Sequence, residues 1–199
     1  MAGVPIACLH AAADFVFSEV PGRFPDLRIA LSEGGIGWIP YFLERIDTLS
    51  ERHHAWTRWN FGGRRPSDTF RKLFLTCFID DAAGIRQRSD IGLDSISWEC
   101  DYPHSDSTWP TAPERLMRSF EGVPDPDIDK ITHQNALRWF QHDAFGRLGG
   151  RQRCTVGALR SQATDVDLTL LRGGGGKAPV EGEARPVRAR DVMKQLSTA

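Results

Sequence analysis

The sequence predicts an α/β fold built on a small parallel sheet. Three short apolar segments, at 27–33, 73–79 and 95–100, alternate with stretches of helical periodicity. Such alternation is typical of parallel strands joined by helical crossovers. The segment 73–79 is almost continuously apolar, which indicates a strand buried on both faces. We therefore expect at least three adjacent parallel strands with helices packed against them.

Helices are expected before, between and after these strands, at residues 6–17, 38–59, 82–91, 112–120 and 128–140. Residues 67–70 can cap a short turn. In the helix predicted at 38–59, apolar side chains recur at helical spacing. They predict a buried stripe made of Trp38, Tyr41, Phe42, Ile46 and Leu49. Pro40 suits the first turn of this helix, where its missing N–H costs nothing.

From about Gly149 the composition changes. One helical turn and a short strand at 166–171 are expected, followed by a glycine-rich linker at 173–176. Proline and charged residues dominate 177–186, which predicts an unstructured segment, and 188–196 could form a frayed helix. The predicted organisation is one α/β domain over 1–147 and a weakly structured, partly disordered tail over 148–199.

Length, charge and cysteine usage restrict the class of protein. The 199 residues can bury one core, and the formal net charge of −1 gives no electrostatic case for binding nucleic acid or an acidic membrane surface. The sequence contains no apolar run long enough to span a membrane. The N-terminus lacks the basic flank of a signal peptide. The four cysteines form no CxxC pair, which predicts reduced thiols and a cytoplasmic location.

One segment, 56–65, interleaves aromatic and basic side chains. This pattern could form a platform for single-stranded nucleic acid. The alternative is a helix end and loop that cover the core or close a pocket. No wider basic surface accompanies the segment, which favours the second interpretation.

Acidic residues stand at the end of each predicted strand: Glu33, Asp80-Asp81 and Asp101. Asp101, His104 and Asp106 fall within six residues. A carboxylate at a strand end, followed by a histidine and a second carboxylate, is what a metal or acid/base site requires. The alternative is a polar loop with solvated carboxylates. For Asp80 or Asp81 we expect an N-cap of the following helix.

Four segments resemble the amidohydrolase-related family, in the branch that includes aminocarboxymuconate-semialdehyde decarboxylase-like enzymes. They are FPDLRIALSEGG at 24–35, Ile39-Pro40, WECDYPH at 98–104 and ITHQNA at 131–136. The likeness runs from about residue 12 to about residue 145, and more weakly through 154–160. It implies a metal-dependent (β/α)8 TIM barrel, of which this chain supplies about strands six to eight.

The resemblance also implies a chemistry and a set of site residues. Members hydrolyse C–N or ester bonds, or decarboxylate a small carboxylic acid, with a divalent ion that is usually zinc. On the family pattern Asp101 binds the metal or takes a proton from its water. Glu33 stands where many relatives have a histidine, and could act in proton transfer. His104 would flank the substrate or orient Asp101. The expected substrate-binding residues are Asp106, Trp98 and Tyr102.

One departure from the family pattern concerns the metal ligands. Relatives carry a paired-histidine motif after strand one and a further histidine after strand five, whereas this sequence contains no HxH. A catalytic zinc site takes about three protein ligands and a water, so the sequence supplies too few ligands to retain the ion tightly. We therefore expect a truncated or split barrel. It would act on a small molecule with a complementing barrel fragment or as a homo-oligomer, or would be a non-catalytic remnant.

Overall fold

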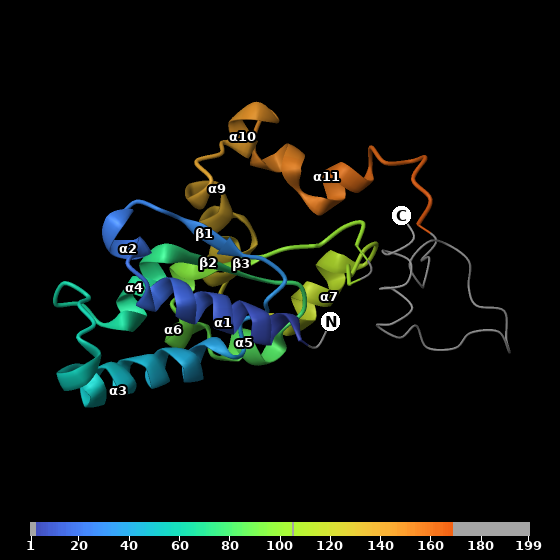
Figure 1. Cartoon of the computed structure of the whole chain (residues 1–199). Helices are drawn as coiled ribbons and strands as arrows, with labels where there is room; N and C mark the ends of the chain where they lie inside the picture. Colours follow the sequence, from blue (N-terminus) through green and yellow to red (C-terminus); the bar gives the residue numbers. More distant parts are fainter. Residues whose placement is uncertain (1–2, 105, 169–199) are drawn as a thin grey trace, which may run out of the picture. The chain divides into compact units, whose positions relative to one another are not determined.

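The computed structural model describes residues 3–104 and 106–168. Strands β1 (Ile29–Leu31), β2 (Phe74–Phe78) and β3 (Ile96–Trp98) form one parallel sheet in the order β1-β2-β3 (Figure 1). Ile29 pairs with Phe74, and Thr76 pairs with Ile96. The prediction of three parallel strands is confirmed. Within the described residues the sheet is open, with β1 and β3 as its two edges.

The remaining elements follow the expected alternation. Before and between the strands lie α1 (Val4–Phe17), α2 (Val20–Arg23), α3 (Ile39–Thr57), α4 (Pro66–Leu73), α5 (Ala82–Arg86), α6 (Arg88–Ile91) and the 3-10 turn η1 (Leu93–Ser95). After β3 come α7 (Ala112–Ser119), α8 (Asp125–Asp129), the π-helical segment η2 (Lys130–Gln134), α9 (Asn135–Trp139), α10 (Ala144–Arg147), η3 (Arg151–Cys154) and α11 (Val156–Arg160).

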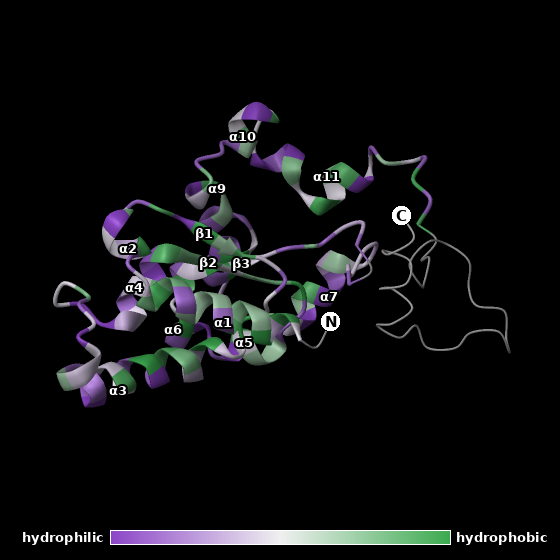
Figure 2. Cartoon of the chain, in the orientation of Figure 1, coloured by the Kyte–Doolittle hydropathy of each residue, from purple (hydrophilic) through white to green (hydrophobic). Residues whose placement is uncertain are grey.

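The hydrophobic core joins the sheet to helices α1, α3 and α4 and also includes buried residues of α5, α6, α7 and η2. All five residues of β2 are buried, as the continuous apolar run predicts. Phe70 of α4 is fully buried and stands at the centre of an aromatic cluster, with its ring centroid 5.0 Å from that of Phe74 and 5.8 Å from that of Phe42. Figure 2 shows the strands as a largely hydrophobic layer, whereas polar residues colour the outer turns of α3.

The longest helix differs from its prediction in two respects. Tyr41 is 72% exposed, so its place in the buried stripe is wrong. The buried residues of α3 are Ile39, Phe42, Leu43 and Ile46, which follow the i, i+3, i+4, i+7 spacing of one helix face, and Tyr41 lies off that face. The helix also ends at Thr57, before the expected Trp59, because Arg58 adopts a left-handed backbone with φ 56°.

The boundaries of other helices and strands also differ from their predictions. The helix predicted at 82–91 is divided at Gln87, and the strands are shorter than expected. The turn expected at 67–70 is instead the full helix α4. Its first turn is held by the Asp68 carboxylate, which accepts from the backbone N–H of Arg65 at 3.2 Å. Phe140, the last residue of the helix predicted at 128–140, lies beyond the end of α9 and is 63% exposed.

The first compact unit of the chain extends to Val166 and includes η3 and α11. Val166, Asp167 and Leu168 are not in a strand, and the rest of the strand predicted at 166–171 lies outside the described residues. The predicted linker 173–176, the segment 177–186 and the terminal helix 188–196 also lie outside them. None of the helices in the described residues combines the length and apolar character needed to span a membrane.

Candidate functional site

The carboxylate of Asp81 fixes the backbone at the carboxyl end of the sheet. It accepts from the N–H of Gly84 at 2.8 Å, which confirms the predicted N-cap of α5. It also accepts from the N–H groups of Ile36 and Gly37, each at 2.7 Å. A Cβ at Gly37 would lie 3.1 Å from this carboxylate, so the glycine lets the loop after β1 approach closely.

Glu99 joins the ends of the two outer strands. Its carboxylate accepts from the backbone N–H of Glu33 and from the hydroxyl of Ser32, both of which follow β1. The N–H of Glu99 donates to the carbonyl of Phe78 at 3.0 Å, which extends the pairing of β2 and β3 by one step. The sequence prediction gave Glu99 no role. The sequence feature that could have pointed to Glu99 is the alternation of side chains along a strand, which places Glu99 on the face of the sheet opposite Trp98.

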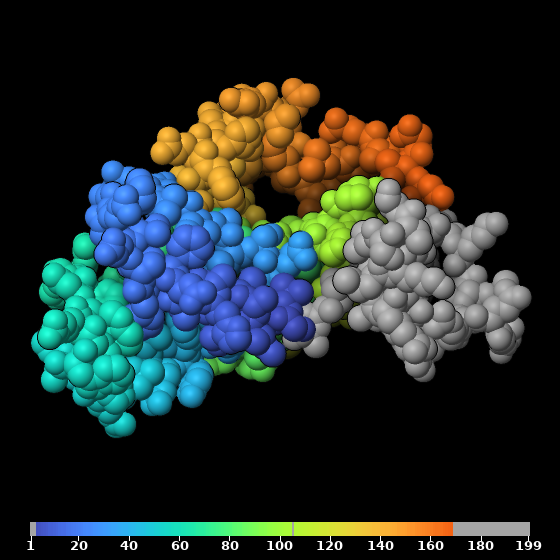
Figure 3. All heavy atoms as spheres, viewed as in Figure 1, coloured from blue at the N-terminus to red at the C-terminus, as the bar shows by residue number. Residues whose placement is uncertain are grey.

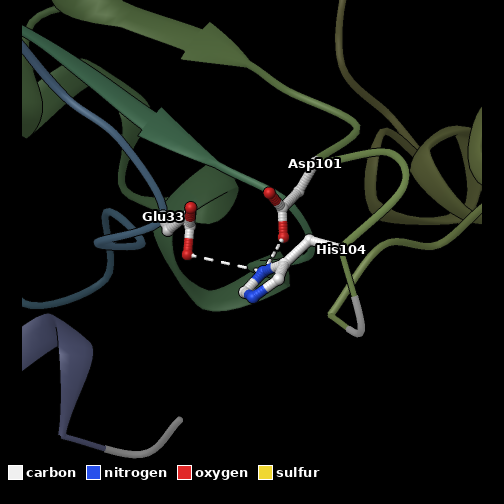
Figure 4. Close-up of side chains that lie close together, drawn as sticks. All are labelled: Glu33, Asp101 and His104. Carbon is white, nitrogen blue, oxygen red and sulfur yellow. Dashed lines mark hydrogen bonds and ion pairs between the residues drawn. The ribbon is translucent and has the colours of Figure 1, made fainter. Parts of the chain in front are cut away.

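Glu33, Asp101 and His104 converge at this end of the sheet (Figure 4). Glu33 follows β1 and Asp101 follows β3, and both adopt left-handed backbones, with φ 60° and 56°. Such conformations are uncommon for residues other than glycine and gather at functional sites. The N–H of His104 donates to the carbonyl of Asp101 at 2.8 Å, which closes a tight turn and returns the imidazole toward the carboxylates.

The imidazole of His104 lies between the two carboxylates. Its Nδ1 is 2.8 Å from Asp101 Oδ2 and 3.9 Å from Glu33 Oε2. The Asp101 side chain is only 14% exposed, compared with 36% for Glu33 and 51% for His104. The hydrogen bond to Asp101 raises the pKa of His104, and the charges of Asp101, Glu33 and Asp106 act in the same direction. The site therefore favours a cation, whether a proton on the imidazole or another positive group.

The three remaining predicted site residues lie in different environments. Asp106 is exposed, and its charge acts on His104. The Trp98 indole packs against the core and donates its N–H to the carbonyl of Ile79 at 3.2 Å. Tyr102 is 62% exposed, and its ring centroid is 5.1 Å from that of Trp109. Substrate contacts by these residues remain predictions.

A cleft of about 550 Å³ adjoins the three converging residues. It shares Glu33 with them, and Asp106 also lines it. Arg115 also lines the cleft and forms an ion pair with Asp80 at 3.2 Å. Thr108, another lining residue, is 7% exposed, and its hydroxyl oxygen has no hydrogen-bond partner among the described residues. The cleft is thus polar and largely acidic, and it opens beside the carboxylates.

The donor set fits a divalent metal ion. One ligand atom from each of Glu33, Asp101 and His104 lies within 4.8 Å of the other two. Two carboxylates and an imidazole are donors that zinc accepts, and three protein ligands is the usual number in a catalytic zinc site. The sequence alone assigned only Asp101 as a ligand, and the structure adds Glu33 and His104 as candidates.

Comparisons with known proteins bear on the family and the fold. The family model described as amidohydrolase matches residues 2–141. The chain resembles the structure of the 5-carboxyvanillate decarboxylase LigW from Sphingomonas paucimobilis, with a TM-score of 0.55 and 23% identity over 66% of this chain and 39% of that one. It also resembles an amidohydrolase from Mycobacterium avium subsp. paratuberculosis K-10, with a TM-score of 0.57 and 20% identity over 68% of this chain and 33% of that one. None of the curated proteins matches.

The family match covers most of the chain, and its range includes both edge strands and the three converging residues. The similarity to solved structures adds that the α/β fold matches amidohydrolase TIM-barrel proteins in part, since the chain spans between a third and two fifths of their lengths. The chain therefore belongs to the amidohydrolase family.

Proposed function

We propose that this chain carries the metal-binding and proton-transfer face of a metal-dependent hydrolase that cleaves a C–N or ester bond in a small molecule. The observation that carries the proposal is the convergence of Glu33, Asp101 and His104, whose ligand atoms lie within 4.8 Å of one another. They come from the ends of the two outer strands, at the edge of a parallel sheet where α/β enzymes place their active sites.

Each of the three residues has a distinct role in this proposal. Glu33, Asp101 and His104 would hold the ion, which is expected to be zinc, and a water molecule bound to it would have its pKa lowered to about 7. Asp101, the least exposed, accepts a proton from the attacking water. The protonated Asp101 carboxyl would then give this proton to the leaving group, and His104, whose Nδ1 lies 2.8 Å from Asp101, would orient that carboxyl group.

Decarboxylation of a small carboxylic acid is the alternative reaction for the same residues. The similarity to a 5-carboxyvanillate decarboxylase favours it, although at 23% identity that likeness concerns the fold. In this reaction Asp101 and His104 would deliver a proton to the carbon that loses carbon dioxide. Hydrolysis instead requires a proton to be removed from water.

The rest of the site would come from further strands. We propose that β1, β2 and β3 correspond to about strands six to eight of the barrel. The open edges at β1 and β3 in the described residues support this assignment. A complementing barrel fragment or a second copy of the chain would cover these edges and add ligands. A non-catalytic remnant is the alternative outcome, in which no metal binds.

Metal content and turnover test the proposal together. We expect the purified chain, alone or with a complementing fragment, to bind one zinc ion per site, measured by atomic emission and by competition with a chromogenic chelator. Asp101→Asn and Glu33→Gln should each weaken binding by at least tenfold, about 1.4 kcal/mol. The control Asp90→Asn, an exposed acid on α6, should not change it.

The reaction is assigned from substrate panels. Release of acid from esters or amides supports hydrolysis, and release of carbon dioxide from aromatic carboxylates supports the alternative. If the wild-type protein binds no metal in any sample, alone or with a complementing fragment, the proposal is contradicted. The chain would then be a non-catalytic remnant of the barrel.

We also propose that the protein works in the cytoplasm on a small molecule, without nucleic acid or a membrane as its partner. Cys8, Cys77, Cys100 and Cys154 are all free thiols, which supports a reducing compartment. The net charge of −1 supports the expectation that the protein does not bind nucleic acid. Fractionation of the source cells, followed by immunodetection, tests the location.

A further inference from the structure

A second cavity lies at the amino end of the sheet. Leu27 and Leu73, which come just before β1 and β2, both line it. Glu33 and Asp101 follow β1 and β3, at the opposite end. The five residues of β2 separate the two ends by about 16 Å. This cavity, of about 310 Å³, is therefore distinct from the candidate metal site.

Aromatic rings from separate segments form one wall of the cavity. Phe17 ends α1, and Trp59 and Phe61 belong to the loop after α3. The Phe17 ring centroid is 4.3 Å from that of Trp59, with an interplanar angle of 44°, and 5.6 Å from that of Phe61, at 80°. These rings present flat apolar surface, and Trp59 remains 36% exposed.

The loop that carries two of these rings is held by its own hydrogen bonds. The Asn60 side-chain oxygen accepts from the N–H of Gly62 at 2.9 Å, and the N–H of Arg64 donates to the carbonyl of Phe61 at 3.3 Å. Gly62 and Gly63 have φ values of 62° and 78°, which the turn requires. These hydrogen bonds hold the wall in place, which lowers the entropic cost of binding a ligand there.

Two cations stand at this cavity without acidic partners. Arg64 and Lys72 both line it, and within the described residues neither side chain forms an ion pair or a hydrogen bond. Among the residues that the structure describes, no aspartate or glutamate lines the cavity. The cleft beside Glu33, in contrast, is lined by four carboxylates. The charge at the amino end therefore complements an anion, and the rings complement an apolar body.

We propose that this cavity binds a small organic anion with a flat apolar body, such as an aromatic carboxylate. The rings of Phe17, Trp59 and Phe61 pack against the body, and Arg64 and Lys72 receive the carboxylate. The volume is near the lower end of the range for small-molecule sites. The mixed aromatic and basic character of 56–65 thus corresponds to a pocket wall.

Two matched probes test the proposal by isothermal titration calorimetry on the full chain. The first is 2-naphthoate, and the second is 2-naphthamide, which has the same ring system and no charge. We expect saturable binding of one 2-naphthoate per chain, about tenfold tighter than the amide, because only the carboxylate can form a charge-assisted hydrogen bond with Arg64 or Lys72. Equal affinities for the two probes, or no saturable binding, would overturn the proposal.

Variants locate the site. Arg64→Gln and Lys72→Gln should each weaken 2-naphthoate binding by about three- to tenfold and leave the amide unchanged. Trp59→Ala should weaken both probes. The control Arg52→Gln, an exposed arginine of α3, should change neither. Asp101→Asn should also leave binding intact. Loss of 2-naphthoate binding in that variant would assign the anion to the metal site and overturn the proposal.

Discussion

The carboxylate of Glu99 accepts a hydrogen bond from the backbone N–H of Glu33, 66 positions earlier in the chain. This bond crosses the end of β2 and holds the residue after β1 against the extension of β3. We expect Glu99→Ala to lower stability by about 1–2 kcal/mol, because a partly buried N–H loses its charged acceptor. It should also weaken metal binding, since Glu33 would no longer be held in its left-handed conformation.

Urea unfolding and a chelator competition measure the two effects of Glu99→Ala. Glu19→Ala, which removes an acid at the start of α2, serves as the control. Unchanged metal affinity in Glu99→Ala would show that Glu33 needs no support from this contact.

Asp81 anchors three backbone N–H groups, from Ile36, Gly37 and Gly84. Replacement by alanine removes the N-cap of α5 and also releases the loop after β1. We expect a loss of about 2–4 kcal/mol in the free energy of unfolding, more than a simple cap contributes. The measurement is urea denaturation. The neighbouring Asp80→Ala removes only an exposed ion pair with Arg115 and should cost less than about 1 kcal/mol.

Asn135 is fully buried and attaches α9 to the sheet. Its side-chain nitrogen donates to the carbonyls of Leu93 and Ile96, both at 2.8 Å. Asn135→Leu fills similar space but leaves both carbonyls without this donor. We therefore expect destabilisation of about 2–3 kcal/mol by thermal or urea unfolding, whereas the exposed Gln134→Leu should stay within about 0.5 kcal/mol. Equal stabilities of the two variants would contradict an anchoring role.

The ion pair between Glu114 and Arg160 makes the attachment of α11 depend on pH. Its hydrogen bonds to Arg160 lower the pKa of Glu114 from 4.5 to about 2. A carboxyl group whose folded-state pKa is depressed contributes stability above its unfolded value. The contribution of this pair is thus complete above about pH 4.5 and declines as the pH falls toward 2.

Hydrogen exchange of the α11 amides between pH 5 and pH 2 checks this prediction, after correction for the intrinsic rates. Protection should decrease with falling pH in the wild-type chain. In Glu114→Gln it should be low throughout and insensitive to pH. A pH response that persists in Glu114→Gln would assign the effect to another group.

The sequence alone predicted the parallel sheet, its three strands and the acids at their ends. These features depend on short-range patterns, such as the continuous apolar run of β2 and the cap at Asp81. The family could also be recognised from the sequence, because the segments that resemble it, FPDLRIALSEGG and WECDYPH, are each contiguous in the chain. The exposure of Tyr41 could not be predicted, because it depends on which face of α3 packs against α4 and α6. The end of α3 could not be predicted either, because it depends on the left-handed backbone of Arg58.

Only the tertiary structure decided which acids act together. Glu33 and Asp101 follow strands that are not neighbours but lie on either side of β2, roughly 10 Å apart. Left-handed backbones at both residues and the turn to His104 bring their side chains within reach. The bond from Glu33 to Glu99 and the aromatic cavity also join distant segments. Local residue patterns carry no information on such pairings, because strand order and long-range hydrogen bonds arise only when the sheet assembles.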